Sequence, residues 1–212
     1  MISPERFGDN RDQALGILQR VSAQLTALLG VETRFELVSE VDDDLLSRMQ
    51  EIEEEVFRIE DNVYTESDLL ECLAMEDALL LALTIDGNVE GYLFGYADEP
   101  GNPVVEGSDY FVDSAVISLA YEAKGIGGLL SLPVLFLIHL LGYKVAGLTT
   151  EEQDKSGRKL ANFYRKIGFV DAPVNREGDV GIGFTLELTP ETLKQVADRL
   201  PHTEYVADAL DS

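Results

Sequence analysis

The spacing of apolar residues predicts helices and short strands in alternation along the chain. Apolar side chains recur three and four positions apart between residues 11 and 29, the period of one helix face, and Gly30 follows as a helix-ending residue. Asp42–Asp44 supply a cap and a negatively charged first turn for a second helix. Two strand-like runs flank Asp86-Gly87-Asn88, a pattern typical of a β-hairpin. The segments predicted in this half are helices at 11–29, 42–57 and 65–75 and strands at 34–38, 78–85 and 89–96.

The second half alternates strands and helices around a glycine-rich turn. Its most apolar stretch, Leu129–Leu141, is shorter than the ~20 residues of a membrane-spanning helix, so it predicts a buried helix. Strands and helices in this order indicate a mixed sheet covered by helices, in the α/β (α+β) class. The segments predicted are a loop at 98–109, strands at 110–119, 144–149 and 180–188, a turn at 124–128, and helices continuing to 141 and at 156–167 and 190–200.

Charge is distributed unevenly along the chain. The 40 acidic residues outnumber 16 Lys and Arg, a formal net charge of −24, while 45% hydrophobic residues argue against a disordered acidic tail. Such acidity disfavours a nucleic-acid binder and an anionic membrane surface as a partner. Residues 1–99 carry a net −18, residues 100–212 a net −6, and the first lysine is Lys124. Either a general cause, such as solubility, a salt-rich cytoplasm or a viral origin, or a functional site explains this asymmetry.

The cysteine and histidine content offers little catalytic chemistry. Cys72 is the single cysteine, so no internal disulfide forms, and residues 1–10 lack the features of a signal peptide; both fit a cytoplasmic protein. No basic neighbour marks Cys72 as a nucleophile, and it is expected in the core. His139 lies in the apolar helix and is expected to be packed there. We expect no metal site.

A glycine turn after the strand at 110–119 is the most informative segment. Strand residues lead into Gly125-Ile126-Gly127-Gly128 and then into the apolar helix. Unpaired N–H groups at a helix N-terminus, with glycines that let a ligand approach, form a phosphate-binding site in physical terms. Lys124 adds a cation. The alternative is an ordinary strand–helix turn in which glycine serves packing.

A second motif follows at a spacing that makes the pair specific. Tyr164, Gly168 and Phe169 match Tyr-x-x-x-Gly-Phe, and Gly125-Ile126-Gly127 match the end of Arg/Gln-x-x-Gly-x-Gly/Ala. Together they resemble the GNAT superfamily of acyl-CoA-dependent N-acetyltransferases over residues 31–188. The resemblance implies a mostly antiparallel central sheet, with residues 1–30 as an N-terminal helical extension and 189–212 as a C-terminal helix and tail. The helix at 11–29 either packs on the core or forms a homodimer contact.

The resemblance also implies a reaction and its residues. Acetyl-CoA is the implied cosubstrate, and an acetyl group passes to a primary amine. Tyr164 would protonate the CoA thiolate, with a packed helix aromatic whose hydroxyl is hydrogen-bonded as the alternative. Asp113 is the candidate base, with an exposed edge charge as the alternative. The strand end would bind the pantetheine arm and the turn the pyrophosphate. The implied CoA-binding residues are Ile117, Ser118, Leu119, Lys124, Gly125, Ile126, Gly127 and Gly128.

The acidic residues bear on the acceptor. Residues 35–77 carry a net −14, and in the family two helices in this region wall the acceptor site. Most of these acids are expected on solvated helix faces, but the excess favours a cationic acceptor, either a small-molecule amine or a lysine-bearing protein. Glu122 stands where the family motif has Arg or Gln. That departure favours an alternative, a catalytically weak or inactive GNAT-fold protein that occupies a basic partner.

Overall fold

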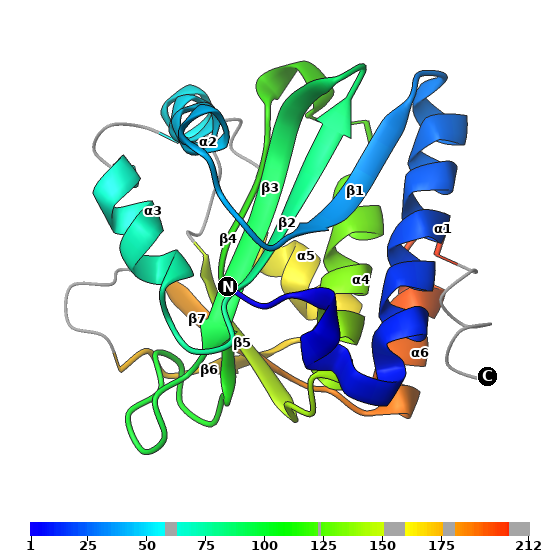
Figure 1. Ribbon diagram of the computed structural model, residues 1–212. Coiled ribbons are helices and arrows are strands. Elements are labelled where there is room, and N and C mark those ends of the chain that lie inside the picture. Colours follow the sequence, from blue (N-terminus) through cyan, green and yellow to red (C-terminus); the bar gives the residue numbers. More distant parts are fainter. Residues whose placement is uncertain (58–62, 123, 151–159, 176–180, 204–212) are drawn as a thin grey trace. The chain divides into compact units, whose positions relative to one another are not determined.

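The computed structural model describes residues 1–57, 63–122, 124–150, 160–175 and 181–203 (Figure 1). The chain divides into two compact units. The first comprises Met1–Tyr96 and Ser114–Ile126, and the second comprises Ala97–Asp113 and Gly127–Ser212. These units are defined by the contacts that residues make within the folded chain. The domain boundaries predicted from the sequence, at residues 30 and 188, stay a prediction.

In the described part of the chain, seven strands form one mixed sheet in the order β1-β2-β3-β4-β5-β7-β6. Strand β4 (Tyr110–Ile117) pairs with β5 (Val145–Thr150) in parallel over Tyr110–Val112, while the pairs β1–β2, β2–β3, β5–β7 and β6–β7 are antiparallel. The predicted mixed, mostly antiparallel sheet flanked by helices is therefore confirmed.

The first unit is built on the hairpin that the sequence predicts. Strands β2 (Leu79–Ile85) and β3 (Asn88–Ala97) pair around a turn in which Asp86 and Gly87 have φ of 50° and 81°. Two successive positive φ values match a twisted two-residue hairpin turn. Strand β1 (Thr33–Val38) pairs with the other edge of β2.

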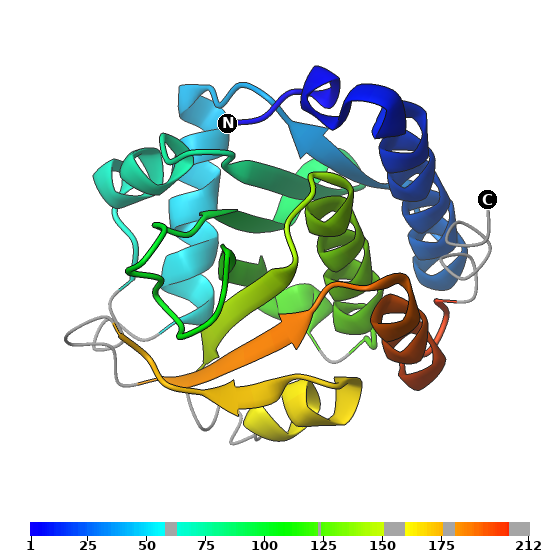
Figure 2. The same cartoon turned by 90° about the horizontal axis from the view of Figure 1, so that it is seen from below.

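Three helices cover the two faces of β1–β3. Helix α1 (Arg11–Leu29) packs against β1 and ends at Gly30, whose φ of 71° provides the predicted left-handed cap. Helices α2 (Asp43–Val56) and α3 (Glu66–Leu73) lie on the opposite face (Figure 2). A short helix at Pro4–Asn10, which the sequence analysis does not predict, precedes α1.

The second unit contains a strand, β6 (Val170–Ala172), that the sequence analysis missed. Strand β7 (Ile182–Glu187) corresponds to the strand predicted at 180–188, and it lies between β5 and β6, so β6 forms the edge of the sheet. A three-residue strand with two exposed positions is too short to show an apolar period.

The helices of the second unit follow the predicted positions. Helix α4 (Gly127–Leu140) is buried at ten positions and continues through Pro133. Helix α6 (Pro190–Arg199) contacts both α4 and α5 (Leu160–Ile167). The predicted start of the α5 segment, at Ser156, lies outside the described residues. Within the described part of the chain, no helix combines the length and apolar character needed to cross a membrane.

Candidate functional site

The end of β4 differs from its predicted form. The strand stops at Ile117, and Leu119 begins a single 3-10 turn, Leu119–Tyr121, rather than ending the strand. The N–H of the buried Ser118 donates to the Glu90 carbonyl at 2.8 Å, and its hydroxyl donates to the Glu90 carboxylate at 2.7 Å. The N–H and the hydroxyl of Ser118 therefore both have partners within the first unit.

Leu119 has a different kind of partner. Its N–H donates to Oε1 of Glu55, an exposed residue on α2, at 2.8 Å, and its own side chain is 45% exposed. The predicted CoA-binding segment is thus held by side chains and backbone of α2 and β3.

The turn before α4 leaves space where glycine stands. Gly125 has a φ of 78°, which side-chain-bearing residues rarely adopt, and a Cβ built there would meet no atom within 4 Å. The exposed Lys124 places its Nζ 4.7 Å from the centre of the Tyr121 ring, while Ile126 is buried. Gly125 is therefore a residue required by backbone conformation and open to an approaching ligand.

The first residues of α4 divide into an open and a packed glycine. Gly127 begins the helix, and a Cβ there would meet nothing within 4 Å. At Gly128 a Cβ would lie 2.9 Å from Cδ2 of Leu200, so the missing side chain serves helix packing. The N–H groups of the first turn of α4 have no partner within the helix and can donate hydrogen bonds to a bound anion.

A buried polar cluster of Glu53, Tyr92 and Ser114 is a feature that the sequence analysis missed. Glu53 on α2 is 1% exposed and accepts hydrogen bonds from the Tyr92 hydroxyl and, at 3.1 Å, from Ser114 Oγ. Burial and the Glu53 charge raise the pKa of Tyr92 well above its usual value. The signal was present in the spacing, because Leu46, Met49 and Ile52 also point inward from α2, and Glu53 continues that face.

Asp113, the candidate base, lies half-buried in β4 and has an interaction partner. Strand alternation places it on the same face as Ile117. Leu119 does not share that face by alternation, because it belongs to the 3-10 turn. The role of Asp113 as a base stays a prediction.

Tyr164 lies on α5 within an aromatic cluster of the second unit. Its ring centre is 5.4 Å from that of Phe163, 5.6 Å from Phe169 and 5.8 Å from Phe184. Burial raises the pKa of its hydroxyl. The phenol is therefore protonated at neutral pH.

The glycine and phenylalanine of the second motif have a local structural reason. Gly168 ends α5 with a φ of 121°, and the N–H groups of Gly168 and Phe169 donate to the Tyr164 carbonyl at 3.2 and 3.0 Å. This is a left-handed helix end that returns the next aromatic ring onto the helix. The motif fixes the direction of the Tyr164 ring.

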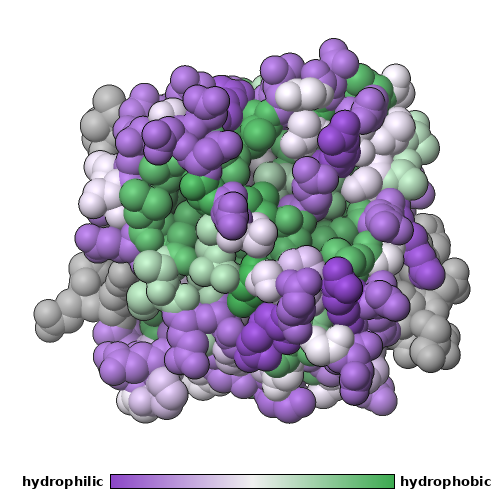
Figure 3. All heavy atoms as spheres, viewed as in Figure 1, coloured by the Kyte–Doolittle hydropathy of each residue, from purple (hydrophilic) through white to green (hydrophobic). Residues whose placement is uncertain are grey.

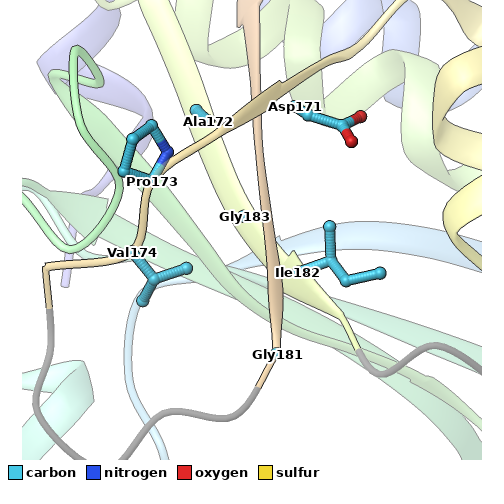
Figure 4. Close-up of a pocket in the computed structure, with 7 residues that line it drawn as sticks. All are labelled: Asp171, Ala172, Pro173, Val174, Gly181, Ile182 and Gly183. Atoms are coloured by element: carbon cyan, nitrogen blue, oxygen red, sulfur yellow. The ribbon is translucent and has the colours of Figure 1, made fainter.

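Two other regions carry none of the predicted site residues. A shallow hollow beside β6 and β7 is lined by residues 171–174 and 181–183 (Figure 4).

His139 is packed as expected, with Nδ1 2.8 Å from the Leu188 carbonyl oxygen. In the described ranges, no group of three or more His, Cys, Asp or Glu side chains is close enough to hold a metal ion.

Hydrophilic and apolar side chains are separated on the first unit's outer helices. In Figure 3 hydrophilic residues cover α2, and apolar residues show beside them over α3. Leu70 and Met75, in and just after α3, are 50% and 48% exposed. A polar and an apolar surface therefore adjoin each other.

Comparison with known proteins identifies the fold. No family model and no curated protein matches this chain. Many solved structures match. A Desulfovibrio desulfuricans protein assigned to the GNAT acetyltransferase family shares 20% identity over 74% of this chain and 99% of its own, with a TM-score of 0.57. The ribosomal-protein-S18-alanine N-acetyltransferase of Escherichia coli shares 15% identity, over 74% and 94%, with a TM-score of 0.56.

A CoA complex is also among the similar structures. An aminoglycoside 6'-N-acetyltransferase complexed with coenzyme A shares 12% identity, over 74% of this chain and 97% of its own, with a TM-score of 0.59. At these identities the likeness concerns the fold. The resemblance drawn from the two sequence motifs is confirmed at that level: this chain has the fold of the GNAT N-acetyltransferases.

Proposed function

We propose that this protein is an acyl-CoA-dependent N-acyltransferase that moves an acetyl group from acetyl-CoA to a primary amine. The observation that carries the proposal is the turn before α4 in a chain with this fold. Gly125 adopts a positive φ, and neither Gly125 nor Gly127 has an atom within 4 Å of the missing Cβ. Open glycines before a helix N-terminus suit a pyrophosphate.

The residues divide the work of binding the cosubstrate. Lys124 supplies positive charge, and the N–H groups at Gly125, Ile126, Gly127 and Gly128 are the proposed donors to the pyrophosphate. The backbone of Ile117, Ser118 and Leu119 is the proposed partner of the pantetheine arm. Of these, Ser118 already donates its N–H to Glu90 and accepts the Tyr121 N–H at its carbonyl oxygen, so its contribution is limited to the second lone pair of that oxygen.

Acyl transfer requires a neutral amine, a polarised carbonyl and a proton for the leaving thiolate. Tyr164 is proposed as the proton donor, because its raised pKa keeps the phenol protonated and a thiol has a lower pKa, about 8.5. Asp113 is proposed to take the proton from the amine. An N–H donor beside the thioester carbonyl would stabilise the developing oxyanion.

The acceptor is proposed to be cationic, either a small-molecule polyamine or a lysine-bearing protein segment. Acidic residues dominate 35–77, with a net −14, and the described ones on α2 other than Glu53 are largely exposed to solvent. Rates of acetylation with a polyamine should exceed those with a monoamine that carries no further positive charge. The polyamine rates should fall as NaCl rises from 0.05 to 0.3 M, since screening weakens attraction between exposed charges. Equal rates and no salt effect would contradict this acceptor class.

A second candidate function is an inactive protein that uses this fold and its acidic surface to occupy a basic partner. Glu122, at the position of the motif's Arg or Gln, favours it, since a carboxylate repels a pyrophosphate. A thermal-shift titration separates the two functions. Acetyl-CoA at 100 times its Kd should stabilise the protein by about 2.7 kcal/mol. ATP, a polyanion without the pantetheine arm, is the matched control, and no shift with millimolar acetyl-CoA favours the binding protein.

The Tyr164→Phe variant tests the chemistry apart from binding. Phenylalanine keeps the ring packing against Phe163, Phe169 and Phe184 but removes the proton. We expect kcat to fall by roughly 100-fold, with the Kd of acetyl-CoA and the melting temperature nearly unchanged. Wild-type activity in this variant would remove the proposed acid role.

A further inference from the structure

Helix α2 holds the end of β4 at separate points. Glu53 accepts from Ser114 at 3.1 Å inside the unit. Glu55 accepts from the Leu119 N–H at 2.8 Å at the surface. The proposed function assigns the backbone of Ile117, Ser118 and Leu119, at this end of β4, to the pantetheine arm. The Glu55 side chain therefore occupies a backbone N–H that the cosubstrate would use.

The two carboxylates differ in how readily they can leave. Glu53 is 1% exposed and also accepts from Tyr92, so releasing it would strand a buried charge and two donors. Glu55 is exposed, so water can replace the Leu119 N–H as its partner at little cost. Of the two, only the Glu55 contact is suited to exchange with a ligand.

The Leu119 N–H can serve one strong acceptor at a time. It stands at the start of the 3-10 turn, where N–H groups lack a partner within the turn itself. A carboxylate is a stronger acceptor than the neutral amide or thioester carbonyl of an acyl-CoA. The two acceptors exclude each other at this atom.

We propose that Glu55 competes with the acyl-CoA for the Leu119 N–H and so sets the affinity of the cosubstrate site. The inference rests on the proposed function, because that function places the pantetheine arm at Leu119. The Glu55 carboxylate moves away from Leu119 before the arm binds. Glu53 stays in place and keeps β4 fixed during this exchange.

Calorimetric titration of the full chain with acetyl-CoA tests the competition. The Glu55→Ala variant should bind roughly three- to tenfold more tightly than the wild type. Glu54→Ala is the matched control, since Glu54 is an exposed neighbour of equal charge that pairs with Gln50 on the same helix. Glu55→Gln, which keeps an oxygen acceptor without the charge, should fall between wild type and Glu55→Ala.

Titrations at 0.05 and 0.3 M NaCl separate the hydrogen bond from general repulsion of the phosphates. Repulsion alone would give Glu55→Ala and Glu55→Gln the same affinity, because both lose the same charge at the same place, and the gain would fade with salt. The competition predicts that the advantage of Glu55→Ala over Glu54→Ala persists. Equal affinities of these two variants, or weaker binding by Glu55→Ala, would overturn the inference.

The Leu119 amide resonance provides a readout that needs no catalysis. In the wild type, saturation with acetyl-CoA should change the chemical shift of this amide. In the ligand-free Glu55→Ala variant the chemical shift should already differ from that of the ligand-free wild type, whereas Glu54→Ala should leave it unchanged. An amide shift unchanged by Glu55→Ala would overturn the competition alone. Absence of acetyl-CoA binding in all variants would overturn the proposed function as well, so the two failures are distinguishable.

Discussion

Glu53 shows how one residue can differ from its neighbours in an acidic run. Glu54 and Glu55 lie beside it in the sequence and are exposed, whereas Glu53 points into the first unit. A buried carboxylate is tolerated when donors satisfy it, and the Tyr92 and Ser114 hydroxyls are two such donors. The cluster joins α2 to β3 and β4, so it stabilises the segment that carries the proposed cosubstrate backbone.

Removing one donor should expose the energetic weight of this cluster. Tyr92→Phe leaves the ring stacked on Phe94 but takes a hydrogen bond from a buried charge. We expect the free energy of unfolding to fall by about 1.5–3 kcal/mol. Urea denaturation measures it, and Glu54→Ala is the surface control, with a change within about 0.5 kcal/mol. A Tyr92→Phe variant as stable as wild type would show that the hydroxyl contributes nothing.

At the residue scale, what the sequence predicts depends on whether a role follows from backbone conformation. Gly125 is predicted from the glycine-rich turn and Gly168 from the end of a helix, and both adopt a positive φ, which restricts the residue type. Glu53 was assigned to a solvated face because charge is usually a good guide to exposure. Only the helix period, continuing from Leu46 and Met49, opposes that expectation. The partner of the Leu119 N–H is 64 positions away in the chain, and no local pattern contains it.

Helix α3 illustrates how a short element gains stability from its first turn. Thr65 and Asp68 form a capping box, in which the Asp68 N–H donates to the Thr65 hydroxyl oxygen at 3.3 Å and the Thr65 N–H donates to the Asp68 carboxylate at 2.9 Å. The Thr65 hydroxyl also donates to that carboxylate, at 2.7 Å. The hydrogen bonds to the carboxylate lower the pKa of Asp68. An eight-residue helix is marginal by propensity alone, so the cap carries weight.

The cap predicts a pH dependence with a definite sign. Because the folded-state pKa of Asp68 lies below the unfolded value, its stabilising contribution is complete above about pH 4 and is lost as pH falls through the folded pKa. The difference in unfolding free energy between wild type and Asp68→Ala should therefore be largest near pH 6 and shrink as the solution is acidified. Urea denaturation from about pH 6 to about pH 2.5 measures it, since the range must extend below the usual pKa of an aspartate. A difference that grows on acidification would contradict the cap.

Two glycines predict opposite effects of the same substitution. At Gly91 in β3 an added Cβ would lie 2.7 Å from the Val116 carbonyl oxygen and 3.3 Å from Ile117 Cα. Gly91→Ala should lower the unfolding free energy by about 1–3 kcal/mol. At Gly16 in α1 a Cβ meets nothing, so Gly16→Ala should raise it by about 0.5–1 kcal/mol. Thermal denaturation compares both with wild type, and the same sign for both would contradict this packing.

Elements were predictable where their signals are local. The bounds of α1, the β2–β3 hairpin and α6 follow from period, caps and turn residues, so the structure differs there by a residue or two. Strand β6 was missed because it exists through pairing with β7, a tertiary contact that its own three residues do not encode. The end of β4 was placed late because Leu119 is apolar, although its side chain is 45% exposed.

At the scale of the whole chain, the net charge of −24 acts on stability as well as on partners. Self-repulsion of like charges disfavours the compact state, and few bases are present to offset it, with only six in residues 1–99. Ion pairs such as Arg6–Asp77 and Arg165–Asp171 involve partly exposed side chains, and such pairs are weak stabilisers. Repulsion therefore dominates the long-range electrostatics.

Salt should consequently stabilise this protein. At 0.05 M the screening length exceeds 10 Å and many carboxylates repel one another, whereas at 0.5 M screening confines repulsion to near neighbours. We expect the free energy of unfolding, measured with urea, to rise by about 1 kcal/mol or more over this range, because the expanded chain suffers less repulsion than the folded one. The exposed substitutions Glu54→Lys and Glu71→Lys together should lessen the rise by reducing the net charge. Stability that stays constant or falls with NaCl would mean that local ion pairs outweigh the repulsion between the excess acidic residues. The negative charge of residues 35–77 would then affect binding of the proposed cationic acceptor and not the stability of the fold.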